Sequence, residues 1–296
     1  MRLTADDLDI IRHVHRHRFL RSTHLIRLLD KRSGKKLLER LAALYHNGYL
    51  DRPRAQLDYY GTAGSTPMVY AVGNRGADVL TELDGITRAK VDWTDKNRTA
   101  RRLFIEHTLL IADLAVALES ACRRHHDVDL IEAHRILASA PEPTRNARNP
   151  WMIPARITHG GATHDVRVIP DKVFGLDFTE ARKRSYFFVE ADRATMPVIR
   201  NHPRQTSFHQ KVLAYYAGGG AANTHGKRFG VGNFRVLTVT TSRERIETMV
   251  NAVKLATRGA GSNQFLFTDR TSLLGCFDIL TLEWITGKGE RVRLAV

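Results

Sequence analysis

The strongest constraint on the fold comes from the first quarter of the chain, where three short helical patterns precede two apolar stretches. Residues 3–17 carry apolar side chains at helical spacing behind Thr4, a residue type that commonly caps helices. Two more helices are expected to begin at the candidate caps Ser22 and Ser33. The third helix is expected to end at Asn47-Gly48, because these residues readily adopt the left-handed conformation that terminates helices.

Two short strands are expected next, at 49–50 and 68–72, with a long polar and glycine-rich tip between them and a helix at 74–83. Three helices followed by a β-hairpin form the order of a winged helix-turn-helix, whose third helix enters the major groove of DNA. We therefore expect residues 1–84 to be a winged helix-turn-helix domain that binds double-stranded DNA. The predicted DNA-binding residues are Lys31, Arg32, Ser33, Lys35, Lys36, Arg40, Arg52 and Arg54, with Tyr59 and Tyr60 near the tip. The alternative is a winged helix that contacts protein.

The charge balance also points to a polyanion. The chain has 46 Lys+Arg against 31 Asp+Glu, a net charge of +15, and residues 1–55 alone hold 13 basic and 6 acidic residues. A basic surface of this kind is typical of proteins that bind nucleic acid. A second cluster, Arg182, Lys183, Arg184 and Arg193, predicts a basic cleft in the second half of the chain.

Several classes of protein are excluded by composition. A hydrophobic fraction of 43% is enough for a packed core, and no run approaches the ~20 apolar residues of a membrane-spanning helix. The two cysteines, Cys122 and Cys276, lie far apart, which argues against a disulfide framework or a structural zinc site. The first residues contain acids and no apolar stretch, so no signal peptide is expected. These features predict a cytoplasmic protein, and they leave its oligomeric state open, with a homodimer as one alternative.

The rest of the chain predicts a linker at 85–96 and an α/β domain at 97–296, so the fold class is α+β overall. A long helix is expected at 97–123. The expected strands are 128–136, 163–169 with its hairpin partner 173–178, 186–190, 234–241, 265–268 and 279–284, and the further helices are 206–217 and 244–257.

Acidic residues in this domain suggest a metal site. Asp171 follows Pro170, and Glu190-Ala191-Asp192 ends an apolar strand about twenty residues later. Two carboxylates at the ends of adjacent strands could hold Mg²⁺, which would polarise a phosphodiester and activate water. The alternative is structural: Asp171 and Asp192 pair with Arg193 or Arg200 and hold loops together.

This order resembles the core of the PD-(D/E)xK nuclease superfamily, in which an acid follows proline and an E-x-K tripeptide ends the next strand. The resemblance implies a nuclease-like α/β fold with Asp171 and Glu190 as catalytic and metal-binding residues. Asp192 stands where the superfamily has lysine. Some members carry that lysine on the following helix, where Lys211 lies in this chain, and some carry an extra acid earlier, which Glu106 matches.

The whole order, from the winged helix to Lys211 and Tyr215, is similar to the replication-relaxation family of plasmid and mobile-element proteins over residues 3–217. Its most specific segment is Glu190-Ala191-Asp192-Arg193-Ala194-Thr195. The resemblance implies DNA binding linked to replication and relaxation of plasmid DNA, in the cytoplasm of a bacterium.

Three hypotheses follow. The first is a sequence-recognising DNA-binding factor whose nuclease-like domain is passive, which the acid at 192 favours. The second is a Mg²⁺-dependent endonuclease or nickase that uses Asp171, Glu190 and Lys211, with Glu106 assisting. The third is a transcription regulator whose second domain only dimerises.

Two other motifs have simpler interpretations. His13-Val14-His15 has the spacing of a relaxase metal motif but falls in a predicted helix, where residues two apart point in different directions. Tyr215-Tyr216 is interpreted as a pair of core or cleft-lining aromatics rather than as nucleophiles.

Overall fold

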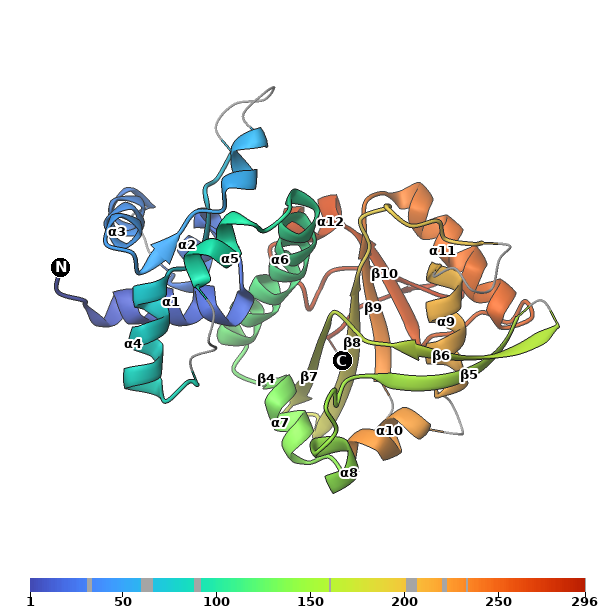
Figure 1. Ribbon diagram of the computed structural model, residues 1–296. Coiled ribbons are helices and arrows are strands. Elements are labelled where there is room, and N and C mark those ends of the chain that lie inside the picture. The colour runs from blue at the N-terminus through green and yellow to red at the C-terminus, as the bar shows by residue number, and fades with distance from the viewer. Residues whose placement is uncertain are drawn as a thin grey trace. The chain divides into compact units, whose positions relative to one another are not determined.

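The chain has a mixed α/β fold that divides into two compact units, Met1–Val116 and Ala117–Val296 (Figure 1). The computed structural model describes residues 1–30, 34–59, 66–87, 92–159, 161–200, 207–219, 223–232 and 234–295, with only the backbone described at 57–59 and 159. Its strands form a three-stranded, a seven-stranded and a two-stranded sheet. Within these residues, no helix combines the length and the apolar character needed to cross a membrane.

The first unit alternates helices with three short strands. Its elements are α1 (Ala5–His17), β1 (Leu20–Arg21), α2 (Ser22–Leu28), α3 (Gly34–His46), β2 (Leu50–Asp51), the 3-10 turn η1 (Arg54–Tyr59), β3 (Val69–Val72), α4 (Asn74–Asp84), α5 (Trp93–Arg98) and α6 (Arg102–Arg124), which contains the boundary between the units. The strands form an antiparallel sheet in the order β1-β3-β2.

The helix ends of this unit follow the predicted signals with one change. Thr4 caps α1 in a capping box with Asp7, and Gly48 has the left-handed φ of 74° expected after α3. Ser22 is not a cap: α2 begins at Ser22 itself, and Arg21 is its N-cap residue. Ser33 lies outside the described residues.

The apolar faces of α1, α2, α3 and α4 form one core. Its members include Ile10, Ile11, Val14, Leu25, Leu28, Leu37, Leu41, Leu44 and Leu80. The helical spacing of these residues explains why the four helices bury one side each. Gln56, in η1, extends the sheet because its side-chain amide accepts from the Val69 N–H at 2.8 Å and donates to the Val69 carbonyl at 3.1 Å. The expected long tip is therefore partly ordered by a turn, and residues 60–65, with Tyr60, lie outside the described residues.

The second unit is built on a seven-stranded sheet. Its remaining elements are β4 (Val128–Glu132), α7 (Ala133–Ala138), α8 (Glu142–Arg145), β5 (Ile153–His159), β6 (Ala162–Val168), β7 (Lys172–Phe178), β8 (Lys183–Ala191), α9 (Phe208–Ala217), α10 (Thr224–Phe229), β9 (Phe234–Thr240), α11 (Arg243–Ala256), β10 (Phe265–Asp269), α12 (Arg270–Gly275), β11 (Trp284–Thr286) and β12 (Arg291–Val292). The strand order is β12-β11-β10-β9-β8-β7-β4, in which β8, β9 and β10 are parallel.

Helices α9 and α11 and the β5–β6 pair share one apolar core with the centre of this sheet (Figure 1). Aromatic rings dominate it: Phe188 stacks on Phe234 with centroids 4.0 Å apart, and Phe188 also stacks on Tyr215 of α9 at 5.5 Å. Because β8, β9 and β10 are parallel, their carboxyl ends lie at one edge of the sheet, where Glu190 of β8 contacts α9.

Several predicted elements of this unit were wrong in extent or pairing. Strand 163–169 corresponds to β6, but it pairs with β5, which was not predicted, and not with β7. The expected strand 128–136 ends at Glu132 because α7 begins there, and the expected strand 279–284 is replaced by β11, which begins at Trp284. In the first unit, the expected single helix 97–123 is two helices, α5 and α6, that are separated at residues 99–101.

Candidate functional site

The candidate site lies where β8 ends beside the start of β7. Asp171 directly precedes β7, and its backbone N–H donates to the Val189 carbonyl of β8 at 2.9 Å. The Ala191 N–H donates to the Asp171 carboxylate at 2.8 Å. The antiparallel pairing of Lys172 with Val189 continues through these bonds, so it sets Asp171 opposite Glu190. The sequence prediction that these two acids lie on adjacent strands at one edge is thus realised.

Glu190 is buried, with 2% of its surface exposed, and both of its carboxylate oxygens have partners. Tyr215 Oη donates to Glu190 Oε1 at 2.6 Å, and Lys211 Nζ forms an ion pair with Glu190 Oε2. Both partners come from α9, four residues apart, so they lie on one face of that helix. The structure therefore brings together Asp171, Glu190 and Lys211, and it adds Tyr215.

The electrostatics of this cluster follow from burial and charge. Burial raises the pKa of Glu190, the Lys211 ammonium lowers it, and the negative Asp171 raises it, with a net rise. Burial lowers the pKa of Lys211, but the negative charges of Glu190 and Asp171 outweigh it, so that pKa is raised. Burial and the Glu190 carboxylate raise the pKa of Tyr215 well above its ordinary value of 10.0. Lys211 is thereby held as a cation and Tyr215 as a neutral donor.

Thr238 extends the site onto the next strand. It pairs with Glu190 in the register of the parallel strands β8 and β9, and its side chain is fully buried. Its Oγ1 atom has no hydrogen-bond partner among the described residues. A buried hydroxyl without a partner is unusual, and it marks this end of β9 as polar.

Asp192 has a partner that the sequence did not predict. Arg245 of α11 binds it through two N–H groups, Nε to Oδ2 at 2.5 Å and Nη2 to Oδ1 at 2.9 Å, and Nη2 also donates to the Met196 carbonyl at 2.6 Å. Thr240 Oγ1 donates to Asp192 Oδ2 at 2.6 Å. Asp192 therefore pairs with an arginine, as the structural alternative expected, but that arginine is Arg245 and not Arg193 or Arg200. No local signal identifies Arg245, because it lies 53 residues further along the chain.

The donor set around Glu190 suits an ammonium ion better than Mg²⁺. Mg²⁺ prefers octahedral coordination by oxygen atoms. Here Lys211 and Tyr215 engage the two Glu190 oxygens, and the Ala191 N–H engages one Asp171 oxygen. Among the described residues of the second unit, no three His, Cys, Asp or Glu side chains bring ligand atoms close enough to share an ion. Lys211 and Tyr215 thus engage the Glu190 oxygens that the sequence assigned to Mg²⁺, and the magnesium site stays a prediction.

Glu106, the fourth predicted catalytic residue, lies on α6 in the first unit. It is half-buried and accepts a hydrogen bond from Arg102 Nε at 2.9 Å. The other three residues belong to the second unit. The assistance of Glu106 to Asp171, Glu190 and Lys211 stays a prediction.

The predicted basic cleft of the second unit is not formed by its four members. Arg182 precedes β8, Lys183 and Arg184 begin it, and Arg193 follows its other end. A strand rises about 3.3 Å per residue, so about 30 Å separates Lys183 from Arg193. Arg184 also pairs with Asp177 of β7 at 2.8 Å.

The predicted DNA-binding residues of the first unit differ in their environments. Lys35 and Lys36 are exposed on α3, and Arg54 is exposed at the start of η1. Arg52 lies over the Tyr45 ring at 4.3 Å and donates to Tyr70 Oη at 3.2 Å. Lys31, Arg32 and Ser33 lie outside the described residues.

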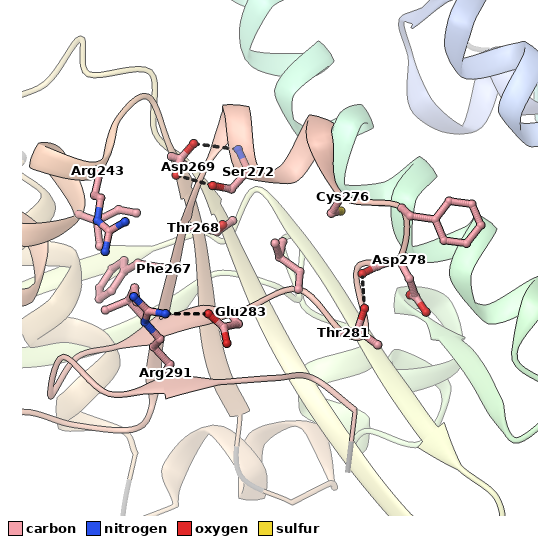
Figure 2. A pocket seen from close by; sticks show the side chains of 14 residues that line it. Arg243, Phe267, Thr268, Asp269, Ser272, Cys276, Asp278, Thr281, Glu283 and Arg291 are labelled. Atoms are coloured by element: carbon pink, nitrogen blue, oxygen red, sulfur yellow. Dashed lines mark hydrogen bonds and ion pairs between the residues drawn. The ribbon is translucent and has the colours of Figure 1, made fainter.

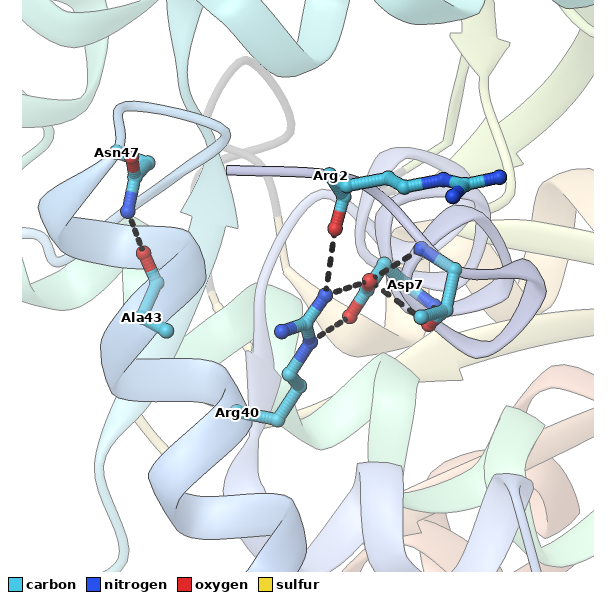
Figure 3. Close-up of polar contacts among 6 residues, drawn as sticks. Arg2, Asp7, Arg40, Ala43 and Asn47 are labelled. Carbon is cyan, nitrogen blue, oxygen red and sulfur yellow. Dashed lines mark hydrogen bonds and ion pairs between the residues drawn. The ribbon is translucent and has the colours of Figure 1, made fainter.

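Arg40 is occupied by a structural contact (Figure 3). Its guanidinium binds both carboxylate oxygens of Asp7 and donates to the Arg2 carbonyl at 3.2 Å. Asp7 is fully buried and also accepts from the Thr4 backbone and hydroxyl. Burial opposes ionisation of Asp7, but the bonds from Arg40 and Thr4 outweigh it and lower the Asp7 pKa. Arg40 therefore fixes α3 to the start of α1.

A separate pocket of about 530 Å³ lies among α11, β10, α12 and the chain that follows α12 (Figure 2). Three of its charged side chains have partners: Asp269 accepts from Ser272 at 2.9 and 2.8 Å, and Arg291 pairs with Glu283 at 3.1 Å. None of the predicted site residues lines it. We assign it no part in the candidate site.

Comparisons with known proteins place the chain in one family. No curated protein and no solved structure matches it. The family model described as replication-relaxation matches residues 11–231, which include α3 as well as Asp171, Glu190 and Lys211. Arg245, the partner of Asp192, lies beyond the matched residues. Because the match covers well over half of the chain, the protein belongs to the replication-relaxation family.

Proposed function

We propose that the protein binds double-stranded DNA of a plasmid or mobile element and acts in its replication or relaxation, with a nuclease-like second unit that does not cut. The family suggests a role in replication of such elements. The proposal assigns DNA recognition to the first unit, interpreted as a winged helix-turn-helix, and a PD-(D/E)xK-like fold without cleavage activity to the second.

The observation that carries DNA binding is the two-sided character of α3. Leu37, Leu41 and Leu44 are buried, whereas Lys35 and Lys36 are exposed. The helix is the third of its unit and is followed by β2 and β3, the order in which a recognition helix precedes a wing. Exposed cations on such a helix would neutralise DNA phosphates.

Replacing Lys35 and Lys36 together with Ala tests this surface. Loss of two phosphate contacts should weaken DNA binding about tenfold or more near 0.1 M salt and reduce the slope of log K against log salt by about 2. Fluorescence anisotropy with a labelled duplex measures both quantities. The matched control is Lys96→Ala with Arg98→Ala, two exposed cations on α5. Equal affinity and slope in the two double variants would remove α3 from the DNA-binding surface.

The inactive character of the second unit rests on the partners of its acids. Lys211 and Tyr215 occupy Glu190, and Arg245 occupies Asp192, at the position where a nuclease would have lysine. The second candidate function is a Mg²⁺-dependent endonuclease or nickase. One observation favours it: Lys211 reaches Glu190 from α9, as a lysine moved to that helix would.

Supercoiled plasmid distinguishes these two functions. We expect the wild-type protein to leave it intact with Mg²⁺ or Mn²⁺, as do Asp171→Asn and Glu190→Gln, which preserve the shape of each side chain. Agarose gels resolve nicked, linear and supercoiled forms. Metal-dependent nicking by the wild type that is lost in both variants would replace the inactive function with the second candidate.

A further inference from the structure

Acidic residues are absent from two long segments of the second unit. The 51 residues from Arg193 to Arg243 contain eight Lys or Arg and no Asp or Glu, and residues 143–164 contain three Arg and neither acid. The second unit as a whole has 26 Lys+Arg against 17 Asp+Glu, a net +9, whereas the first has a net +6. Most of the excess positive charge therefore lies outside the proposed recognition unit.

The fold brings these two segments together at α8 and α10. Thr144 Oγ1 donates to the Arg228 carbonyl at 2.7 Å, and the Trp151 and Phe229 rings stack with centroids 4.9 Å apart. Gly230, just after α10, has a φ of 69°, and a Cβ there would lie 2.6 Å from the carbonyl oxygen of Ser139, so the end of α10 also approaches the end of α7 closely. We call Arg145, Arg148, Lys227 and Arg228 the α8–α10 corner.

Among the described residues, no acidic side chain neutralises the cations of this corner. Arg145, Arg148 and Lys227 are exposed, and Arg228 is half-buried with an Nε atom that has no hydrogen-bond partner among the described residues. Arg145 donates through one nitrogen to the Ala138 carbonyl at 3.3 Å. No acidic side chain in the described part of the chain pairs with any of the four. The neighbouring acid Glu142 accepts from Asn146 at 3.4 Å.

We propose that the α8–α10 corner binds the phosphate backbone of double-stranded DNA, as a contact additional to α3. Several uncompensated like charges on one surface repel each other, and a polyanion relieves that repulsion while its counterions are released. The anchored backbone holds the side chains on a fixed base, so little conformational freedom of the backbone is lost on binding. The inference rests on the proposed DNA binding and names a second surface for it.

The test replaces Arg145, Arg148 and Lys227 together with Ala in the full-length protein. The matched control replaces Lys254, Lys288 and Arg293, three exposed cations elsewhere on the same unit. With a labelled restriction fragment, we expect the corner variant to bind about tenfold or more weakly near 0.1 M salt, with a salt slope lower by about 2 to 3. The control should stay within about twofold of wild type. Circular dichroism confirms that both fold.

Three outcomes would overturn parts of the proposal separately. Equal losses of DNA affinity in the two triple variants would remove the α8–α10 corner from the DNA-binding surface and leave the proposed role of α3 unaffected. Failure of the wild type to bind any duplex overturns the proposed function itself. Competition by polyglutamate as strong as that by DNA, at equal charge concentration, replaces DNA with an acidic protein as the corner's partner.

Discussion

Replacing Lys211 with Met should lower the free energy of unfolding by about 3–5 kcal/mol at pH 8, because it leaves the Glu190 carboxylate buried without its cation. Only 3% of the Glu190 side chain is exposed, so water cannot replace the lost charge. Chemical denaturation followed by circular dichroism measures the change. Tyr215→Phe is the comparison: it removes one hydrogen bond to the same carboxylate and should cost about 1–3 kcal/mol.

The effect of Lys211→Met should shrink as the pH falls. Burial raises the Glu190 pKa above its ordinary value of 4.5, and loss of the ammonium removes the main influence that lowers it. A group with a raised pKa in the folded state binds its proton more tightly there, so its contribution is present at low pH and is lost as the pH rises through the folded value. The variant should therefore be closer to wild type at pH 5 than at pH 8. An equal loss of unfolding free energy at pH 5 and pH 8 would show that Glu190 does not take up a proton when Lys211 is absent.

Replacing Arg245 with Met should destabilise the protein by about 2–4 kcal/mol. Among the described residues, the largely buried Asp192 side chain would keep only its Thr240 and Ala194 donors. The bond to the Met196 carbonyl would also be lost. Hydrogen exchange should then accelerate at the amides of residues 192–196, which these bonds hold.

Arg245→Lys provides the control for Arg245→Met, because it keeps the charge but cannot reproduce the two-pronged geometry. It should recover part of the stability and less of the exchange protection. Unchanged exchange at 192–196 in Arg245→Met would show that the segment is held by its own backbone and not by α11.

The sequence predicts those parts of the fold whose causes are local. Helix α3 is recognisable because Leu37, Leu41 and Leu44 repeat at helical spacing and Gly48 can end it. Strand β8 is recognisable as an apolar run that ends in acids. The link from Glu190 to Lys211 was available only through resemblance to a nuclease motif. Lys211 lies 21 residues further along the chain, and the intervening segment 201–206 is outside the described residues.

Other features depend on distant pairing, which a sequence pattern does not encode. Strand β6 could pair with β5 or β7, and the choice depends on how Ile153, Ile157 and Val168 pack into the shared core. The partners of Arg40 and Asp192 lie 33 and 53 residues away. In a chain with many Lys and Arg residues, the sequence does not indicate which cation pairs with which acid. The sequence therefore locates the acids and the helices but not the arginines that bind the acids.

The double role of Asp7 has a practical consequence for any shortened version of the protein. The Asp7 carboxylate takes part in the capping box of α1 and also binds Arg40 of α3. The position of α3 therefore depends on the first turn of α1 as well as on its own residues. A protein that starts after Asp7 would retain Lys35 and Lys36 unchanged in sequence. It would nevertheless present them from a helix that has lost its contact with the start of α1, because Arg40 would no longer have Asp7 as its partner. Truncation could thus alter binding to a polyanion through a residue that the intact chain keeps engaged.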